Sequence, residues 1–454
     1  MVCECKNIDG KEYYFNPYNM MVGSTKDSVK TDQWLEEDAR YHPYNWYKNT
    51  LINSGSSDIN DPSDNLILHL NLNTKCNCCC GYCFRMNGQK LDEGYDVEKA
   101  KKIVDIVFTI YKDKIESKRF NISVSVTGEP FYDSDSLWEI IDYIREKCNY
   151  NYDCWDFFII TNGTNVSDRD IERIKELNIP VSISIDGTKE VQDKLRPMKN
   201  GESSYDHIVD FMKKMTSLTN GDYWFDAEMT VVPLLDEQRD IMSMVEHLKN
   251  MGFKKLDFQP IKKNDEYWTD ERYNDIIERY IDFYKKLQHQ VIFENRFDIF
   301  KILIKLNEGL SQIDERFCYS SCGEIRTSQL IIDRNGDVYG CDHFLGNKQY
   351  KTNFNIFNFN RMDYVNYKRN RVSERTLDNF SECKECKYRY FCGGKGFICH
   401  LYGEKTIKMH CAIQKIKFNA LLNIYEYLFR ISDYDKKKLD DLFRKYKIAN
   451  YKYY

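Results

Sequence analysis

The stretch LILHLNLNTKCNCCCGYCF, residues 66–84, decides how the rest of the chain is interpreted. Its first half alternates apolar and polar residues and predicts a β-strand over 66–73. Its second half places Cys76, Cys80 and Cys83 in the spacing C-x3-C-x2-C directly after that strand. Three thiolates in one short loop can hold three irons of a [4Fe–4S] cluster and leave the fourth iron open. A zinc loop or a Cys-rich turn is the alternative, but zinc usually takes four protein ligands.

A regular alternation of strands and helices follows this stretch and predicts the fold class. The β-like runs cover 66–73, 122–127, 156–161, 181–186, 224–232 and 254–261. The helix-like stretches lie near 97–117, 135–147, 167–177, 204–217, 235–250 and 271–288. Ser167 followed by Asp170 is typical of a helix N-cap. The alternation predicts an α/β fold with a parallel sheet, either a barrel or a doubly wound sheet, and its six strands fall short of the eight of a complete barrel.

Composition excludes several classes of function. The 454 residues carry a net charge of −5 and a hydrophobic share of 42%, which predicts a folded chain of two or three domains without a nucleic-acid partner. The sequence has neither an apolar signal segment nor a run long enough to span a membrane, so we expect a cytoplasmic protein. In a reducing compartment, its 17 cysteines favour metal ligands over disulfides.

Further motifs make the chain resemble the radical S-adenosylmethionine (SAM) family. Thr127-Gly128-Glu129-Pro130 ends the second strand and resembles the family's G-G-E-P loop, and Thr161-Asn162-Gly163-Thr164 ends the third. Ser182-Ile-Ser184-Ile-Asp186-Gly187 continues to Asp193-Lys-Leu-Arg196 and resembles the run S-x-D-G…H-D-x-x-R, with Gln192 in place of His. The resemblance implies SAM bound at an open iron and a 5′-deoxyadenosyl radical that abstracts a substrate hydrogen. It implies cofactor-binding roles for Tyr82, Thr127, Gly128, Glu129, Pro130, Asn162, Ser184 and Arg196.

A second group of cysteines resembles the SPASM extension of radical SAM enzymes that modify peptides and proteins. That resemblance implies two auxiliary [4Fe–4S] clusters, hence three clusters in all. Their expected ligands are Cys318, Cys322, Cys341, Cys383, Cys386, Cys392, Cys399 and Cys411. The family has a cysteine four positions after Cys392, where this chain has Gly396, so either Cys399 substitutes or one iron stays open. A zinc ribbon is the alternative for this region.

The resemblance predicts a partial (β/α)6 TIM-like barrel with a C-terminal Cys-rich iron–sulfur (SPASM) domain. We expect a possible peptide-docking segment over 1–63, the barrel over 64–300, the SPASM domain over 301–415 and a helical tail over 416–454. The sequence around Asn335-Gly336 predicts a β-hairpin that ends near Cys341, and Lys11–Val22 predicts another.

The predicted function is a radical SAM peptide maturase that cross-links a ribosomally made peptide, most plausibly by a cysteine thioether. The first alternative is an anaerobic sulfatase-maturing enzyme that makes formylglycine, for which Asp342 is the candidate general base. The second is a non-catalytic iron–sulfur or zinc module. The enzyme readings imply an electron donor such as flavodoxin or ferredoxin. The sequence identifies neither the peptide, nor the linked residues, nor the oligomeric state.

Overall fold

The computed structural model describes part of the chain in two compact units. The described residues are 4–8, 11–15, 22–24, 66–83, 94–116, 120–123, 128–149, 157–303, 329–341, 344–345, 351–374, 383, 386 and 402–431. The larger unit comprises residues 61–283 and 326–367, and the smaller comprises 1–60, 284–325 and 368–454. These units are compact regions of contact, and the four domain boundaries drawn from the sequence stay a prediction.

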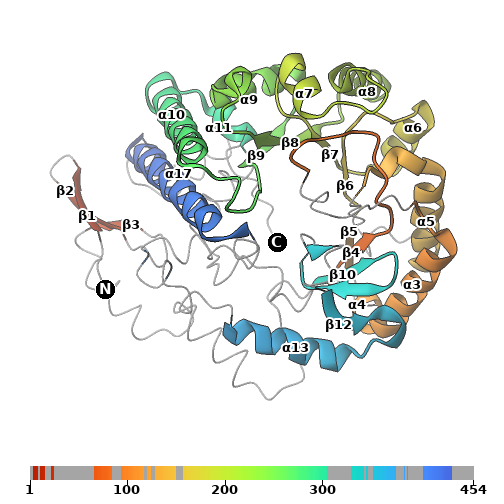
Figure 1. Ribbon diagram of the computed structural model, residues 1–454. Coiled ribbons are helices and arrows are strands. Elements are labelled where there is room, and N and C mark those ends of the chain that lie inside the picture. Colours follow the sequence, from red (N-terminus) through yellow and green to blue (C-terminus); the bar gives the residue numbers. More distant parts are fainter. Residues whose placement is uncertain are drawn as a thin grey trace. The chain divides into compact units, whose positions relative to one another are not determined.

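Two sheets form the centre of the larger unit (Figure 1). In one sheet, β6 (Ile159–Thr161), β7 (Val181–Ser184), β8 (Phe225–Val231) and β9 (Lys255–Pro260) run parallel in sequence order. In the other, β4 (Leu66–Asn71) pairs in parallel with β5 (Phe120–Ser123). All six strands predicted from the sequence are present, which confirms the α/β class with parallel strands.

Helices cover the outer face of these strands (Figure 1). They are α3 (Val97–Ile110), α4 (Lys112–Glu116), α5 (Ser134–Lys147), α6 (Asp168–Glu176), α7 (Lys189–Leu195), α8 (Ser204–Leu218) and α9 (Ile241–Met251), with 3-10 turns η2 (Pro130–Asp133) and η4 (Asp236–Gln238). Ser167 caps α6 in a capping box with Asp170, as predicted. The sequence had not predicted α7 as a separate helix.

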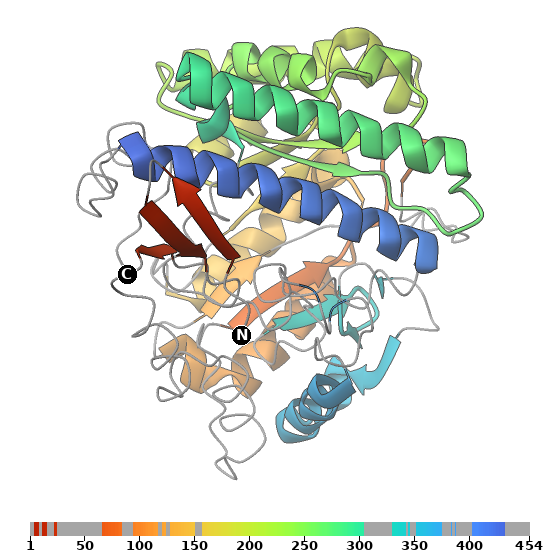
Figure 2. The same ribbon diagram turned by 90° about the vertical axis from the view of Figure 1, so that its left-hand side faces the viewer.

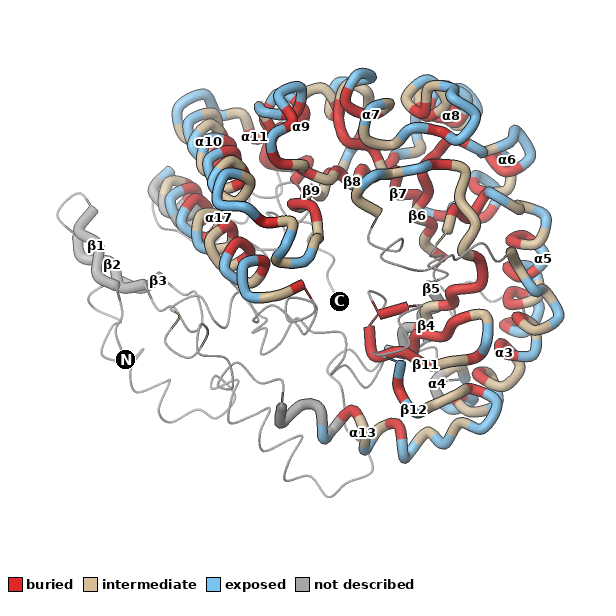
Figure 3. Tube along the Cα trace, in the orientation of Figure 1, coloured by how far each residue is buried: buried red, intermediate tan, exposed pale blue. Residues whose placement is uncertain are grey.

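Residues alternate between the two faces of β8. Phe225, Ala227, Met229 and Val231 are buried, and Phe225 packs edge-on against Phe211 of α8. The polar residues between them are only half-buried (Figure 3), and by the alternation of a strand they lie on its opposite face. The core therefore lies between strands and helices, and the opposite face of β8 carries polar side chains.

The predicted hairpin around Asn335-Gly336 is confirmed and extends the β4 sheet. β10 (Gln329–Asp333) pairs antiparallel with β11 (Asp337–Tyr339), and β12 (Lys351–Asn355) follows at the edge. Gly336 has φ +81°, which favours glycine at the tip. β10 also pairs in parallel with β4, so residues from distant parts of the chain form one sheet. η8 (Ile356–Asn358) and α13 (Arg361–Glu374) come next, and α13 continues into the smaller unit.

The smaller unit contains a three-stranded antiparallel sheet and long helices. β2 (Lys11–Phe15) pairs with β3 (Val22–Ser24), which confirms the predicted N-terminal hairpin, and also with β1 (Glu4–Ile8). α17 (Glu404–Ile431) begins before the predicted helical tail, which was expected from residue 416, and it lies along the end of α10 (Asp270–Glu294) (Figure 2). α11 (Phe297–Ile302) also belongs to this unit. No described helix is both long and apolar enough to cross a bilayer.

Candidate cofactor site at the carboxyl ends of the strands

The loop that follows β4 carries the three cysteines singled out from the sequence. Cys76, Cys80 and Cys83 are all half-buried, and the amide of Cys83 donates to the carbonyl of Cys80 at 3.1 Å in a turn. Within the described part of the chain, no three His, Cys, Asp or Glu side chains converge in a geometry ready for a metal ion. The thiols thus share one loop without yet pointing to a common centre.

Backbone hydrogen bonds attach this loop to the segment after α7. The amide of Cys79 donates to Pro197 O at 2.8 Å, and the amide of Lys199 donates to Asn77 O at 2.9 Å. Between them, Cys78 and Met198 form an isolated antiparallel bridge. The cysteine loop is therefore held in a fixed position by the protein itself.

Asn162, at the end of β6, fixes the same loop from another side. Its Nδ2 donates to Asn77 Oδ1 at 2.9 Å and lies 3.6 Å from Cys76 Sγ and 3.4 Å from Cys78 Sγ. Thr164 completes the contact, because its hydroxyl accepts from Asn77 Nδ2 at 2.8 Å. The T-N-G-T motif is thus brought to the cysteine loop as a structural clamp.

The cysteine thiols differ in acidity. Hydrogen bonding from the Cys78 side chain lowers the pKa of Cys76 to about 6, with smaller contributions from Asn162 and Lys199. Burial raises the pKa of Cys80 to about 12 against the opposing charge of Arg196. Cys76 is therefore the thiol most ready to act as a thiolate ligand.

Glu129 of the T-G-E-P motif is buried and bonded within the protein. Its carboxylate accepts from the amide of Asn162 at 2.7 Å, from the amide of Phe131 at 3.2 Å and from the Thr161 hydroxyl. Burial raises the pKa of Glu129 to about 8, and these hydrogen bonds oppose the shift. Glu129 therefore fastens the T-G-E-P motif to the end of β6, and Pro130 starts η2 directly after it.

Gly128 lets this motif approach the cysteine loop. Its amide donates to Asn73 O at 3.0 Å, and the next amide, of Glu129, donates to Lys75 O at 2.7 Å. A Cβ at position 128 would lie 2.3 Å from Lys75 O. Any side chain there would push the two segments apart.

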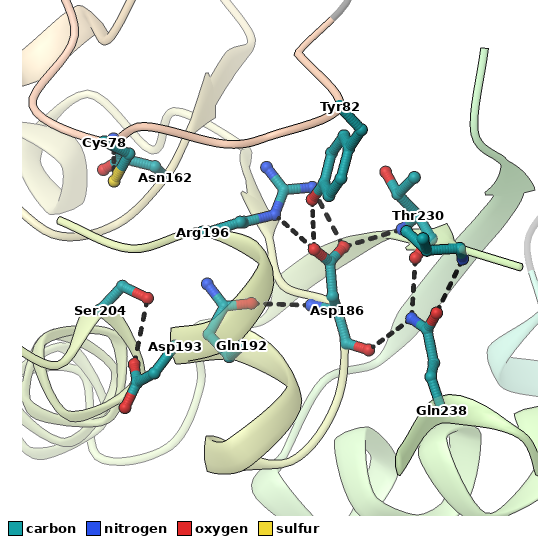
Figure 4. A network of polar contacts seen from close by, with 11 residues as sticks. Cys78, Tyr82, Asn162, Asp186, Gln192, Asp193, Arg196, Ser204, Thr230 and Gln238 are labelled. Atoms are coloured by element: carbon teal, nitrogen blue, oxygen red, sulfur yellow. Dashed lines mark hydrogen bonds and ion pairs between the residues drawn. The ribbon is translucent and has the colours of Figure 1, made fainter. Parts of the chain in front are cut away.

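Asp186, at the end of β7, organises the centre of the site (Figure 4). Its fully buried carboxylate accepts from Arg196 Nε at 2.9 Å and Nη2 at 3.1 Å, and from the amide of Thr230 at 2.8 Å. The Tyr82 hydroxyl also donates to it, and the Arg196 guanidinium lies 5.2 Å from the Tyr82 ring centroid. Arg196 thus packs against Tyr82, and its two-nitrogen fork is taken by Asp186.

Neighbouring side chains fix the backbone of this region. Gln192, which stands in place of the family's His, accepts from the amide of Asp186 at 2.8 Å. Asp193 accepts from the Ser203 hydroxyl at 2.7 Å and the amide of Tyr205 at 3.0 Å, at the start of α8. Gln238 donates to Asp186 O at 3.0 Å and to Thr230 O at 2.7 Å. The sequence motif contained Asp186 without giving it a role, and no sequence signal pointed to Gln238.

The structure describes only some of the remaining predicted site residues. Ser184 is half-buried at the end of β7 and pairs in register with Glu228. Cys341 is buried after β11 in the larger unit, whereas Cys383, Cys386 and Cys411 are half-buried in the smaller one. Six predicted residues lie outside the described part of the chain, namely Thr127, Cys318, Cys322, Asp342, Cys392 and Cys399.

The donors at the cysteine loop fit an iron–sulfur cluster. Three thiols share one loop, one of them has a lowered pKa, and N–H groups of Cys78 and Asn162 lie at the Cys76 sulfur. Hydrogen bonds to the ligand sulfurs are a regular feature of such clusters. The loop stands at the carboxyl end of parallel strands, where α/β folds bind their ligands.

Comparison with known proteins identifies the domain. Residues 70–248 match the model of the radical SAM superfamily. The match takes in the three-cysteine loop and the strands β6, β7 and β8, and these residues form a radical SAM domain.

Individual relatives extend beyond that domain. A cysteine-type anaerobic sulfatase-maturating enzyme of Clostridium novyi is 24% identical over 70% of this chain and 84% of its own length. The antilisterial bacteriocin subtilosin biosynthesis protein AlbA of Bacillus subtilis is 24% identical over 88% of this chain and 78% of its own length. The structure of anSMEcpe with bound AdoMet and the Cp18Cys peptide superimposes with a TM-score of 0.61 at 18% identity, over 79% of this chain and 98% of that one. This last likeness concerns the fold.

Proposed function

We propose that the chain is a radical SAM enzyme that modifies a peptide or protein substrate. The observation that carries the proposal is the C-x3-C-x2-C loop, clamped by Asn162 and by residues 197–199 at the carboxyl end of parallel strands. Cys76, Cys80 and Cys83 would hold a [4Fe–4S] cluster and leave one iron open for SAM. The bound cluster supplies the electron that cleaves SAM reductively.

The residues around the loop would bind and orient SAM. Arg196 carries a positive charge into a site that is otherwise rich in thiols and carboxylates, and its Nη1 lies outside the fork to Asp186. A guanidinium is suited to a ligand carboxylate because it is always charged and directional. Ser184 at the end of β7 and the backbone of Thr127–Pro130 complete the proposed set. Tyr82 and Asp186 hold Arg196 in its orientation.

We extend the proposal to the architecture and the cofactors. The six strands β4–β9 would form the partial (β/α)6 barrel, and residues 301–415 would form a SPASM domain with two auxiliary clusters. The placement of Cys341 at the end of the β10–β11 hairpin supports this reading. Cys399 is the proposed replacement for the ligand missing at Gly396.

The proposed reaction is cross-linking of a ribosomally made peptide through a cysteine thioether. In that reaction a carbon and the cysteine sulfur each lose a hydrogen, and a carbon–sulfur bond forms between them. The carbon-bound hydrogen would leave as an atom to the SAM-derived radical, and the thiol hydrogen would leave as a proton. The remaining electron would leave toward the auxiliary clusters, and an electron donor such as flavodoxin or ferredoxin would supply the electron for SAM cleavage. The chain is similar to a subtilosin biosynthesis protein over 88% of its length, and this similarity supports a peptide substrate.

Formylglycine formation on a sulfatase is the second candidate function. It is favoured by the similarity to sulfatase-maturating enzymes, which spans 70% of this chain in the Clostridium novyi protein. In this reading Asp342, directly after Cys341, would act as the general base.

Two measurements test the proposal. Replacing Cys76, Cys80 and Cys83 together with Ala should abolish production of 5′-deoxyadenosine after anaerobic reconstitution, while the exposed neighbour Cys79→Ala should retain it. Undiminished cleavage in the triple variant would refute the assignment. Mass spectrometry then separates the two reactions. The cross-link removes two hydrogens from a co-encoded peptide and protects its cysteine from alkylation, whereas formylglycine appears on a sulfatase peptide.

A further inference from the structure

Leu234 adopts a backbone conformation that its side chain disfavours. It follows β8, in the turn formed with Pro233, and has φ +60°. A left-handed conformation is unfavourable for a residue with a Cβ, because the Cβ comes too close to the following carbonyl oxygen. The other described non-glycine residues with positive φ are all asparagine, which tolerates it, namely Asn149, Asn178, Asn220 and Asn295.

The protein holds Leu234 in this conformation by hydrogen bonds on both sides. Its amide donates to Asp275 Oδ2 at 2.8 Å, and Asp275 is paired with the buried Arg279 at 2.7 Å. Arg279 Nη1 donates to the carbonyl of Leu235 at 2.9 Å. On the other side, Gln238 accepts from the amide of Val232 at 2.8 Å. The turn is therefore rigid, and it keeps its shape at the cost of strain.

This turn is joined to the centre of the cofactor site. Gln238, which holds Val232, also donates to the carbonyl of Asp186 and to that of Thr230 (Figure 4). Leu234 thus follows β8 at the same carboxyl edge on which Asp186 follows β7. Despite its apolar side chain, 44% of Leu234 is exposed.

We infer that Leu234 is a specificity-determining residue that contacts an apolar side chain of the peptide substrate. A glycine or asparagine could adopt this turn without strain. The leucine is strained there, so we attribute its presence to a contact that its apolar side chain makes. The turn is fixed to the same Gln238 that holds Asp186, so the contact would be made at a set place relative to the cofactor. The inference rests on the proposed function as a peptide-modifying enzyme. It names one residue by which the enzyme would select its peptide substrate.

The test compares three variants in the reconstituted full-length enzyme, with the synthetic peptide encoded beside the gene as the probe. Leu234→Gly and Leu234→Asn should raise KM for the peptide about tenfold, as expected when an apolar contact of this size is lost. The midpoint of thermal unfolding should stay unchanged or rise, because the strain is relieved. SAM cleavage without peptide should be unchanged. Leu218→Asn is the matched control, since Leu218 is 38% exposed and ends α8 on the opposite edge of the sheet.

The outcomes distinguish this inference from the proposed function. If the wild-type enzyme modifies the peptide and both Leu234 variants keep its KM, the inference is wrong and the function stands. A lowered unfolding midpoint together with an unchanged KM would give Leu234 a purely structural role and overturn the inference. If the wild-type enzyme cleaves SAM but modifies no peptide, the proposed substrate class and this inference are both wrong.

Discussion

Asp186 and Arg196 form a two-bond ion pair inside the protein, with Arg196 Nε and Nη2 donating to the two carboxylate oxygens at 2.9 and 3.1 Å. The Asp186 side chain is fully buried, and only 12% of the Arg196 side chain is exposed. The pair therefore positions a cation beside the cysteine loop, and its loss would leave a charge without a partner in a poorly solvated place.

Asp186→Asn should destabilise the larger unit strongly. Removing one partner of a buried ion pair leaves the other uncompensated, and the cost is about 3 kcal/mol in the free energy of unfolding. Urea unfolding of the cluster-free protein measures it. Glu237→Gln, which removes the partner of the exposed Lys194, is the control and should leave the free energy of unfolding nearly unchanged. Equal effects of the two substitutions would contradict the central role of Asp186.

Arg196→Lys should weaken SAM binding about tenfold without loss of iron. A lysine ammonium retains the charge but loses both the fork to Asp186 and the directed third nitrogen. Equilibrium binding of SAM to the reconstituted enzyme measures the dissociation constant, and Lys194→Gln in the last turn of α7 is the control. An unchanged constant in Arg196→Lys would place SAM elsewhere.

Gly128→Ala should disturb the cysteine loop. The new Cβ would meet Lys75 O at 2.3 Å, so the hydrogen bond from the amide of Glu129 to that oxygen should break. Overpacking of this kind typically costs about 1–3 kcal/mol, and we expect a lower iron content per chain after reconstitution. Gly81→Ala is the matched control in the same loop, because a Cβ at position 81 would meet nothing within 4 Å. Full iron loading of Gly128→Ala would show that the loop can shift freely.

Asp226→Asn should stabilise the protein at neutral pH. Burial raises the pKa of Asp226 from its ordinary value of 3.8, Lys255 opposes the shift, and Asp226 Oδ1 finds no hydrogen-bond partner among the described residues. Because the folded-state pKa is the higher one, folding favours the protonated carboxyl. The associated stability is present below pH 3.8 and is lost as the pH rises through the folded-state pKa.

The substitution removes a carboxylate charge that burial disfavours at pH 7. Thermal unfolding at several pH values is the measurement, with the exposed Asp222→Asn as the control. Wild type and Asp226→Asn should converge as the pH is lowered. A destabilised Asp226→Asn at pH 7 would mean that the carboxylate is bound by a group that the contacts do not reveal.

Periodic patterns made the strands and most helices of the larger unit predictable. The alternation in β8 and the Ser167–Asp170 pair at α6 are local signals, since neighbouring residues alone determine them. The seven-residue helix α7 was not predicted, because so short a helix has too few apolar positions to show a hydrophobic periodicity. The start of α17 at Glu404 was missed because its first turns are charged.

The cysteine ligands of the candidate site were predictable from the sequence, but the hydrogen bonds that hold the cysteine loop in place were not. Spacing alone singled out Cys76, Cys80 and Cys83, because a cluster imposes that spacing on one loop. The clamp of residues 197–199 on Cys79 and the contacts of Gln238 with Asp186 join segments that are far apart in sequence. Such contacts depend on the folded topology, so the local sequence around either partner does not predict them.

The pairing of β10 with β4 has a consequence for how the chain is made. Ile67 in the strand before the cysteine loop pairs with Gln329, so one side of β4 stays open until the ribosome has passed that residue. A shortened chain ending near residue 300 would contain every motif of the cysteine loop and still expose a strand edge to other molecules. The nascent chain could therefore self-associate through this open edge during synthesis. Pairing of the β10–β11 hairpin with β4 covers the edge and removes that hazard.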